Sequence, residues 1–442
     1  MHDDFTTIWP VTSKRAETGE LHLGGVGVNA LAERFGTPLY VYDERTLRQR
    51  ARLVRDAFAA VYPRSRVVYA GKAFLNFALL RILREEGYGL DVVSGGELHA
   101  GLRAGMPVDH ITFHGNNKGE DELAEAIAAG VGTIVVDNEH EIGLLGCLAA
   151  DRSEPVRVML RLNPGIDVHT YAKIRTGVAD SKFGMPIASG MAERAVAAIQ
   201  RHTTLDFVGF HAHIGSQLVD AASYVEAIDV LFAFASTMRQ KYGVALREVS
   251  PGGGFGIAYA PGDHEADIGA WAEAASNAVL AACARLDLPL PLLTVEPGRT
   301  IVGPAGVALY RVGAVKALPG VRTYVSVDGG MADNIRPTLY GARYTAALAN
   351  RVPAGNPETV TIAGKYCESG DLLIEDIALP PLLPGDLLAV PAAGAYCLSM
   401  ASNYNLALRP AVVLVNDGEA RLIRRRERYD DLIRYDVVPD EG

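Results

Sequence analysis

Residues 66–104, RVVYAGKAFLNFALLRILREEGYGLDVVSGGELHAGLRA, decide the fold. Two short valine-containing runs, each ending in glycine or polar residues, alternate here with longer stretches rich in alanine and leucine. A β-branched run followed by apolar residues at three- and four-residue spacing predicts a strand, a loop and a helix. Repetition of that unit predicts a parallel sheet, because two parallel strands need a connection of helix length between them.

The same unit recurs up to about residue 296, and the stretches 119–129 and 191–200 show the helical spacing. Eight repeats match the size of a (β/α)8 TIM-like barrel. A doubly wound open sheet is the alternative, but polar residues follow every strand, which favours the barrel because its active site draws on many loops. The predicted strands are RVVYAGK (66–72), GLDVVSGG (89–96), HITFHGNNK (110–118), GTIVVDNE (132–139), VRVMLRLNPG (156–165), FVGFHAHIGS (207–216), REVSPGGGFG (247–256) and LLTVEPGR (292–299).

After about residue 305 the pattern changes to short alternating runs broken by glycine and proline, which predicts a mainly antiparallel β domain. The run TPLYVYDE (37–44) is predicted to be a strand of the same domain. We therefore expect an N-terminal segment of the β domain at 1–45, the barrel at 46–305 and the C-terminal β domain at 306–442.

Composition limits the classes of partner. The chain has 442 residues, 49% of them hydrophobic, and carries 42 Lys and Arg against 52 Asp and Glu, a net charge of −10. An acidic balance without a long basic run argues against nucleic acid as a partner. The sequence contains no apolar stretch long enough to span a membrane and no signal-peptide pattern, and its four cysteines are scattered. We therefore expect a cytoplasmic protein that does not bind membranes.

Two strand ends carry candidate catalytic groups. Lys72 directly follows the first barrel strand, where partial shielding from water would make its amine a nucleophile or a Schiff-base former; an ordinary solvated lysine is the alternative. His211 and His213 lie two residues apart in HAHIGS. They could bind a metal, pack in the core, or lie flat against a cofactor ring with Ser216 near a phosphate. Since the other candidate ligands, His114, Asp137 and Asp91, show no metal-binding spacing, we expect no metal.

The last two barrel strands add candidates for an anion and a ring. The run GGGFG (252–256) lacks bulky side chains at Gly254 and Gly256, so that backbone N–H groups can approach a phosphate, although tight turns use such runs too. EPGR (296–299) contains Glu296, a carboxylate able to pair with a protonated pyridine nitrogen. The alternative interpretation of this motif is a surface turn with a local ion pair. Together with Lys72 these parts predict a site for pyridoxal 5'-phosphate.

The β domain contains polar clusters that a purely structural domain would not need. Arg336 offers a fork for a carboxylate, Glu368 an acceptor for an ammonium group, and Cys367 a thiol able to donate a proton. Each of them has an ordinary structural alternative, an ion pair for the charged groups and an inert buried thiol for the cysteine.

In this order, the motifs YAGKA, LDVVSGGEL, HGNNK, DSKFG, HAHIGSQ, GGGFG, EPGR, VDGGMADNIRPTLY, CESGD and GAYC resemble those of the diaminopimelate decarboxylases. The resemblance extends from about residue 25 to about residue 440. That family is a fold-type III pyridoxal phosphate family, similar to alanine racemase and the ornithine decarboxylases, with a barrel and a β domain in a head-to-tail homodimer. Lys365 and Tyr366 depart from the proline and small residue that many members have before the cysteine, which affects loop shape more than chemistry.

The resemblance implies a role for each matching residue. Lys72 would hold the cofactor, His213 would stack on its ring, Glu296 would face its pyridine nitrogen, and Cys367 would donate a proton from the partner subunit. The catalytic residues would be Lys72, His213 and Cys367. The cofactor-binding residues would be Lys72, His213, Ser216, Gly254, Gly256, Glu296, Pro297, Gly298, Arg299 and Tyr396. The substrate-binding residues would be Arg299, Arg336, Tyr340, Glu368 and Tyr396.

The reaction implied by the resemblance is decarboxylation of meso-2,6-diaminopimelate to L-lysine and CO2, the last step of bacterial lysine biosynthesis. Arginine beside an acid fits the distal carboxylate and ammonium of that amino acid, and ornithine would leave an arginine without a carboxylate partner. Two other hypotheses are a relative without catalytic activity, which would be expected to lack Lys72 or the CES segment, and a metal-dependent barrel hydrolase.

Overall fold

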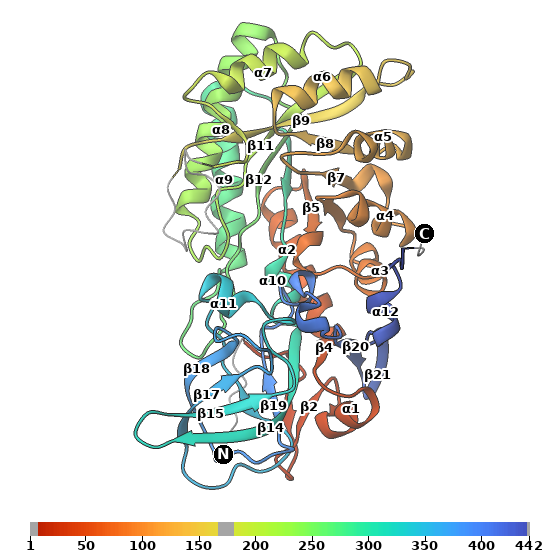
Figure 1. Cartoon of the computed structure of the whole chain (residues 1–442). Coiled ribbons are helices and arrows are strands. Elements are labelled where there is room, and N and C mark those ends of the chain that lie inside the picture. Colours follow the sequence, from red (N-terminus) through yellow and green to blue (C-terminus); the bar gives the residue numbers. More distant parts are fainter. Residues whose placement is uncertain (1–7, 167–180, 440–442) are drawn as a thin grey trace. The chain divides into compact units, whose positions relative to one another are not determined.

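The computed structural model describes residues 8–166 and 181–439. The chain forms two compact units (Figure 1). The first, called here the barrel unit, comprises Arg50–Ile257 and His264–Thr300. The second, called the β unit, comprises Met1–Gln49, Ala258–Asp263 and Ile301–Gly442. No helix among the described residues is both long and apolar enough to cross a membrane.

The barrel unit is built on a closed parallel sheet, and all eight predicted strands are present. The strands pair in the order β9-β11-β12-β13-β5-β6-β7-β8, and β8 pairs with β9 to close the ring. Their bounds are β5 Ser65–Ala70, β6 Gly89–Val92, β7 Ile111–Phe113, β8 Thr133–Val136, β9 Val156–Asn163, β11 Leu205–His211, β12 Glu248–Gly252 and β13 Leu292–Val295. A two-residue strand that we did not predict, β10 Met185–Pro186, pairs with β9. Closure excludes the open-sheet alternative.

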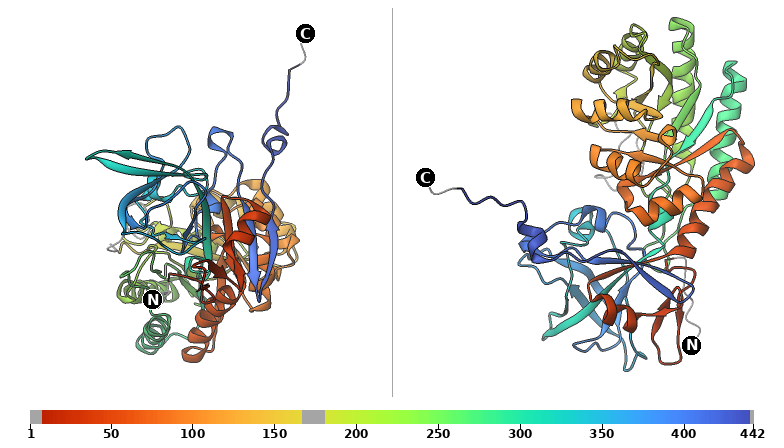
Figure 2. Two further views of the ribbon diagram at one scale, coloured as in Figure 1. Left: turned by 90° about the horizontal axis from the view of Figure 1, so that it is seen from below. Right: turned by 90° about the vertical axis from the view of Figure 1, so that its right-hand side faces the viewer.

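Helices between these strands lie on the outside of the ring (Figure 2). Four of these helices have an N-cap residue whose side chain accepts a hydrogen bond from a backbone N–H of the first turn. These residues are Asn76 before α3, Ser94 before α4, Asn138 before α6 and Asp267 before α9. The bounds are α2 Glu44–Val61, α3 Phe77–Glu85, α4 Gly95–Arg103, α5 Glu120–Ala129, α6 Glu139–Leu148, α7 Met191–Ile199, α8 Ala222–Tyr242, α9 Ile268–Leu286 and α10 Arg299–Val302. Each strand therefore ends at one rim of the barrel, where the loops to the next helices begin.

A buried ion pair lies under that rim. Lys118 Nζ donates to Glu141 Oε1 at 2.6 Å, to the Val135 carbonyl at 2.8 Å and to the Gly115 carbonyl at 2.8 Å. Both charged side chains are almost fully buried. The three acceptors satisfy all three protons of the ammonium group, which is what a buried lysine requires.

The β unit contains a larger, mainly antiparallel sheet, as predicted, and strand β4 (Leu39–Asp43) from the N-terminal segment belongs to it. The strand order is β18-β17-β15-β14-β4-β20-β21, with β19 beside β14 and β16 beside β19, and only β15–β17 and β20–β4 are parallel pairs. The bounds are β14 Gly306–Leu318, β15 Arg322–Val327, β16 Ala347–Leu348, β17 Glu358–Ala363, β18 Leu372–Leu379, β19 Leu387–Val390, β20 Ala411–Asn416 and β21 Glu419–Arg424.

Smaller elements complete this unit. They are a three-stranded sheet of β1 Lys14–Arg15, β2 Leu21–Leu23 and β3 Val26–Gly27, and the helices α1 Val28–Phe35, α11 Arg336–Tyr340 and α12 Tyr429–Ile433. Alternate residues of β4, β14 and β20, such as Val41, Val307 and Val413, meet in one apolar core. Burial of each such side chain contributes about 1.5–3 kcal/mol.

A polar cluster lies within the β unit around Asp333. Its Oδ2 atom accepts from the hydroxyls of Tyr310 at 2.5 Å and Tyr40 at 3.1 Å, and Oδ1 accepts from the Gly330 amide at 2.9 Å. Burial raises the pKa of the Asp333 carboxyl to about 6, although these hydrogen bonds act in the opposite direction. The native structure therefore favours the protonated form of this side chain more than the unfolded chain does.

Candidate active site

Lys72 lies at the rim of the barrel unit, immediately after β5. It occupies a short 3-10 turn, Gly71–Ala73, in which its neighbours are buried and its own side chain is exposed. Tyr69 braces the turn by donating to the Phe74 carbonyl at 2.7 Å. A side chain at position 71 would come within 2.9 Å of the Asp91 carbonyl, so glycine there lets the turn lie against the end of β6. The chain thus presents an amine at the barrel rim.

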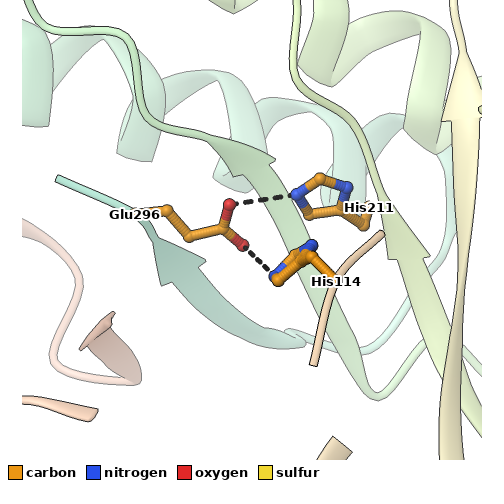
Figure 3. Close-up of side chains that lie close together, drawn as sticks. All are labelled: His114, His211 and Glu296. Carbon is orange, nitrogen blue, oxygen red and sulfur yellow. Dashed lines mark hydrogen bonds and ion pairs between the residues drawn. The ribbon is translucent and has the colours of Figure 1, made fainter. Parts of the chain in front are cut away.

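Glu296 follows β13, the strand next to β5 in the barrel, so that Lys72 and Glu296 come from neighbouring strand ends. Figure 3 shows its carboxylate facing two imidazoles. His211 Nε2 lies 3.0 Å from Oε2, and the Ser250 hydroxyl donates to Oε1 at 2.7 Å. His114 Nε2 lies 3.6 Å from Oε1. All of these groups are buried.

The surroundings of this cluster shift the pKa values of its two acids, Glu296 and Asp91, in opposite directions. Burial alone would raise the pKa of Glu296, but attraction to His211 and the hydrogen bonds from His211 and Ser250 outweigh it and hold that pKa below its usual value. Burial, with the negative charge of Glu296, raises the pKa of Asp91 well above the usual range. Burial also lowers the pKa of His114. At neutral pH the cluster therefore holds an ionised Glu296 and a neutral His114, and Asp91 binds a proton more tightly than an ordinary aspartate does.

His213 lies two residues beyond the cluster, just after β11, and is half-buried. Burial, followed by the positive charge of Lys72, lowers its pKa well below the usual value, so the ring is neutral. A side chain at Gly252 would meet the His213 Nδ1 atom at 2.7 Å. The backbone of β12 therefore packs closely against this imidazole, which limits its freedom to rotate.

The predicted phosphate loop is closely packed against its neighbours. Gly254 has a φ of +106°, and a side chain there would come within 2.4 Å of the Gly215 carbonyl. The Gly256 amide donates to the Leu218 carbonyl at 2.8 Å, so this N–H ties the loop to the segment between β11 and α8. Beside the loop, Arg299 Nη2 donates to the Ser216 hydroxyl at 3.0 Å. Arginine, hydroxyl and glycine backbone together are groups that bind a phosphate.

The EPGR turn is held against the first strand of the barrel. The Pro297 carbonyl accepts from the Ala70 amide at 3.0 Å. A side chain at Gly298 would meet the Cβ atoms of Ala70 and Ala73 at 3.0 and 3.1 Å. The absence of a side chain at position 298 therefore lets the turn carrying Glu296 lie directly beside the turn carrying Lys72.

The predicted substrate residues of the β unit form a separate cluster around Arg336, the first residue of α11. Its Nη1 atom donates to the Tyr344 hydroxyl, and its guanidinium lies 4.8 Å from the centre of the Tyr259 ring. The Tyr344 hydroxyl also lies 3.4 Å from Cys397 Sγ. Burial raises the pKa of Tyr344. A cation fixed in this way can receive a carboxylate.

The remaining predicted residues of the β unit differ in their exposure. Tyr340, at the end of α11, and Tyr396, which has a φ of +61°, are half-buried. Cys367 and Glu368 are exposed in a loop, and the Cys367 amide donates to Asn405 Oδ1 at 3.2 Å. The structure thus brings Lys72, His213 and Glu296 together through shared charges and neighbouring strands, whereas Cys367 and Glu368 form a second, exposed group.

Sequence reasoning missed four residues of these clusters: His114, Ser250, Asp91 and Tyr344. His114 and Asp91 were considered only as metal ligands, and their spacing did not fit. His114 directly follows β7, however, and a position at a strand end is the same signal that identified Lys72. The nearest donor atoms of His114, His211 and Glu296 lie within 4.8 Å of one another, a set that can bind a divalent metal or orient a carboxylate against a ring nitrogen.

Comparisons with known proteins narrow these possibilities. Residues 44–303 match the family described as pyridoxal-dependent decarboxylase, pyridoxal binding domain. The chain is 46% identical to the diaminopimelate decarboxylase of Bacillus subtilis strain 168 over 426 residues, 96% of this chain and 97% of that protein. It is 48% identical to the diaminopimelate decarboxylase of Synechocystis over 440 residues, 98% of this chain and 93% of that protein. The crystal structure of diaminopimelate decarboxylase from M. jannaschii in complex with L-lysine superimposes with a TM-score of 0.89 at 34% identity, covering 97% of this chain and 98% of the other.

Proposed function

This chain belongs to the diaminopimelate decarboxylases, within the family of pyridoxal-dependent decarboxylases, and from that premise we propose how its residues divide the work. The reaction is the pyridoxal-dependent removal of CO2 from meso-2,6-diaminopimelate to give L-lysine, the last step of bacterial lysine biosynthesis. The observation that carries the assignment of roles is the pairing of β5 with β13, which places the Lys72 amine and the Glu296 carboxylate at neighbouring strand ends.

The described residues fit pyridoxal 5'-phosphate. Lys72 would hold it covalently, and Ser216, Arg299 and the backbone at Gly254 would bind its phosphate. His213 would lie against its ring, and Glu296, kept ionised by its neighbours, would face the ring nitrogen. When bound, this cofactor supplies an electron-withdrawing ring that accepts the electron pair left by CO2. Glu296 favours that chemistry because its charge keeps a proton on the nitrogen.

The substrate's far end carries one positive and one negative group. We assign Arg336, aimed by Tyr344, to the distal carboxylate, and Arg299, Tyr340 and Tyr396 to the remaining substrate contacts. Glu368 would accept from the distal ammonium group. Ornithine and lysine have no distal carboxylate, so Arg336 would lack a partner when either of them is bound. This costs about 1–3 kcal/mol and disfavours both as substrates.

Cys367 and Glu368 would complete the site of a second copy of the chain in a homodimer. In support, both are exposed on the loop that follows β17. Cys367 would donate the proton that replaces CO2 on the substrate carbon. A monomer would then lack both this donor and the acceptor for the ammonium group. We place this dimer in the cytoplasm.

An absorbance spectrum of the purified protein, before and after borohydride, tests the cofactor assignment, with Lys72→Ala as the matched control. The wild type should be yellow, and borohydride should fix the cofactor on the peptide that contains Lys72. Addition of meso-diaminopimelate should release CO2 and L-lysine. A colourless protein that cannot be loaded with pyridoxal phosphate would refute the assignment, and a yellow protein inactive on diaminopimelate would refute the substrate alone.

The shared site has its own test. Lys72→Ala and Cys367→Ala chains should each be inactive or nearly so alone, but a mixture allowed to exchange subunits should regain activity. One of the two sites in each mixed dimer would then contain both intact residues. A mixture that stays at the level of the separate variants, although exchange is shown by mass spectrometry, would contradict the sharing.

A further inference from the structure

The buried Glu296 carboxylate has hydrogen-bonding partners on both of its oxygens. His211 Nε2 lies 3.0 Å from Oε2 and the Ser250 hydroxyl 2.7 Å from Oε1. The carboxylate side chain is only 7% exposed. A buried ionised acid needs such partners, since removing an uncompensated carboxylate from water costs several kcal/mol.

Hydrogen-bond chemistry fixes the form of the His211 ring. An ionised carboxylate can only accept, so Nε2 of His211 must carry the proton that it shares with Glu296. The other ring nitrogen, Nδ1, is buried and finds no hydrogen-bond partner among the described residues. A fully buried imidazole that satisfies one nitrogen and leaves the other unsatisfied is expensive for packing alone. Its contact with Glu296 is the benefit that the structure shows.

The second imidazole, His114, does not hydrogen-bond to Glu296 but packs against the His211 ring. Its ring meets that of His211 edge-on, with centroids 4.7 Å apart. Its Nε2 atom lies between Glu296 Oε1 at 3.6 Å and Asp91 Oδ1 at 3.7 Å, both longer than a hydrogen bond. His114 therefore separates the two carboxyl groups and buttresses the His211 ring, while His211 alone of the two makes the direct contact.

Other charges around the cluster act on it from several strands. Lys72 after β5, Asp91 on β6, Arg161 on β9 and His213 after β11 all interact electrostatically with members of the cluster. The hydrogen bonds that the described residues show to the Glu296 carboxylate come from His211 and Ser250. The orientation of that carboxylate thus depends on His211 and Ser250.

We propose that His211 is a positioning residue, which through its Nε2–H group holds the Glu296 carboxylate ionised and aimed at the ring nitrogen of the bound cofactor. This inference rests on the proposed function and deepens it, since it assigns to His211 a role that acts through Glu296. Because the ring charge matters during loss of CO2 and not in binding the distal end of the substrate, His211 should affect kcat much more than KM.

The test compares His211→Phe, which removes the donor, with His211→Gln, which keeps an N–H group. Three readouts are taken: the affinity for pyridoxal phosphate measured by absorbance titration, the pH dependence of the bound cofactor's spectrum, and kcat and KM for diaminopimelate. In His211→Phe, kcat should fall about 10²-fold with KM within about 2-fold, the scale for losing one preorganised donor. The spectral transition should shift by about one pH unit or more. His211→Gln should recover most of both changes.

Two further variants keep the proposal open to refutation. Ser250→Ala removes the other donor without changing the packing of a large ring and should lower kcat about 10-fold. In a Glu296→Gln background, His211→Phe should cause little additional loss, because the group it positions is gone. Equal losses in His211→Phe and His211→Gln, additive losses with Glu296→Gln, or an unchanged spectrum in both His211→Phe and Ser250→Ala would overturn the proposal. A wild type that binds no cofactor would instead overturn the proposed function.

Discussion

Replacement of Asp333 by asparagine should change how the stability of the β unit depends on pH. The carboxyl has a pKa of about 6 in the fold and 3.8 as its ordinary value, a difference of about two units, or about 3 kcal/mol. A raised folded-state pKa means that the native state holds the proton more tightly than the unfolded chain does. The charged form is therefore a stability cost above pH 6, and this cost is relieved as the pH falls from 6 toward 3.8.

The magnitude follows from linkage. Between pH 8 and pH 4.5, the free energy of unfolding of the wild type should rise by about 2 kcal/mol relative to that of Asp333→Asn, because only the wild type gains a proton on folding at this site. Asparagine keeps one oxygen that can accept from the Tyr310 and Tyr40 hydroxyls, but it loses the acceptor for the Gly330 amide. That loss does not depend on pH, so it shifts the stability of the variant without changing the slope that is compared. Taking the difference between the two proteins cancels the titration of all other groups.

Urea unfolding followed by circular dichroism, at half-unit pH steps, measures this difference. Asp386→Asn is the control of opposite sign: burial would raise the pKa of Asp386, but paired hydrogen bonds from Arg351 at 2.7 Å hold it below its usual value. The wild-type advantage over Asp386→Asn should therefore shrink as the pH falls toward that pKa. If the curves for wild type and Asp333→Asn stay parallel within about 0.5 kcal/mol, the account of the Asp333 cluster is wrong.

Three further outcomes are expected. Cys367→Ala should lower kcat about 10²-fold, the usual scale for a general acid, while the absorbance of the bound cofactor stays normal; near-normal turnover would remove Cys367 as the proton donor. Tyr344→Phe should raise KM for diaminopimelate about 10-fold or more and leave kcat nearly unchanged, because Arg336 loses the acceptor that aims it, and an unchanged KM would contradict that role. Lys118→Met should destabilise the protein by about 3–5 kcal/mol, since Glu141 is left buried without its partner. The double variant with Glu141→Leu should recover most of that loss in thermal unfolding, and a double variant less stable than Lys118→Met would argue against the ion-pair explanation.

The strands of the barrel were predictable because each is a short apolar run that ends in polar or glycine residues, and longer stretches with helical spacing lie between these runs. Strand β10, only two residues long, pairs with β9 through backbone groups and has no side-chain pattern of its own. The run 37–44 was expected to join the β domain, and β4 does so by pairing with β14 and β20.

The candidate site was predictable only in part. Lys72 and Glu296 each follow a strand, and the same rule places His114 at the rim, but its contact with Glu296 arises only when the ring of strands closes. Tyr344 has no signal in sequence, because its meeting with Arg336 depends on how the chain turns after α11. Pair contacts between distant segments are set by tertiary packing, and a single sequence does not encode them as a local pattern.

The position of strand β4 has a consequence for how the polypeptide folds during synthesis. β4 lies between β14 and β20, and both of these neighbours leave the ribosome hundreds of residues after it. Until they arrive, β4 exposes two unpaired edges, the kind of surface that recruits other chains. The barrel strands before residue 296 can pair earlier. The nascent chain can therefore complete the barrel first, and the sheet of the β unit, which combines N-terminal and C-terminal strands, last. Chaperone contact and misassembly should therefore concentrate on the N-terminal segment, and loss of β20 by truncation should leave β4 open to aggregation even where the barrel is intact.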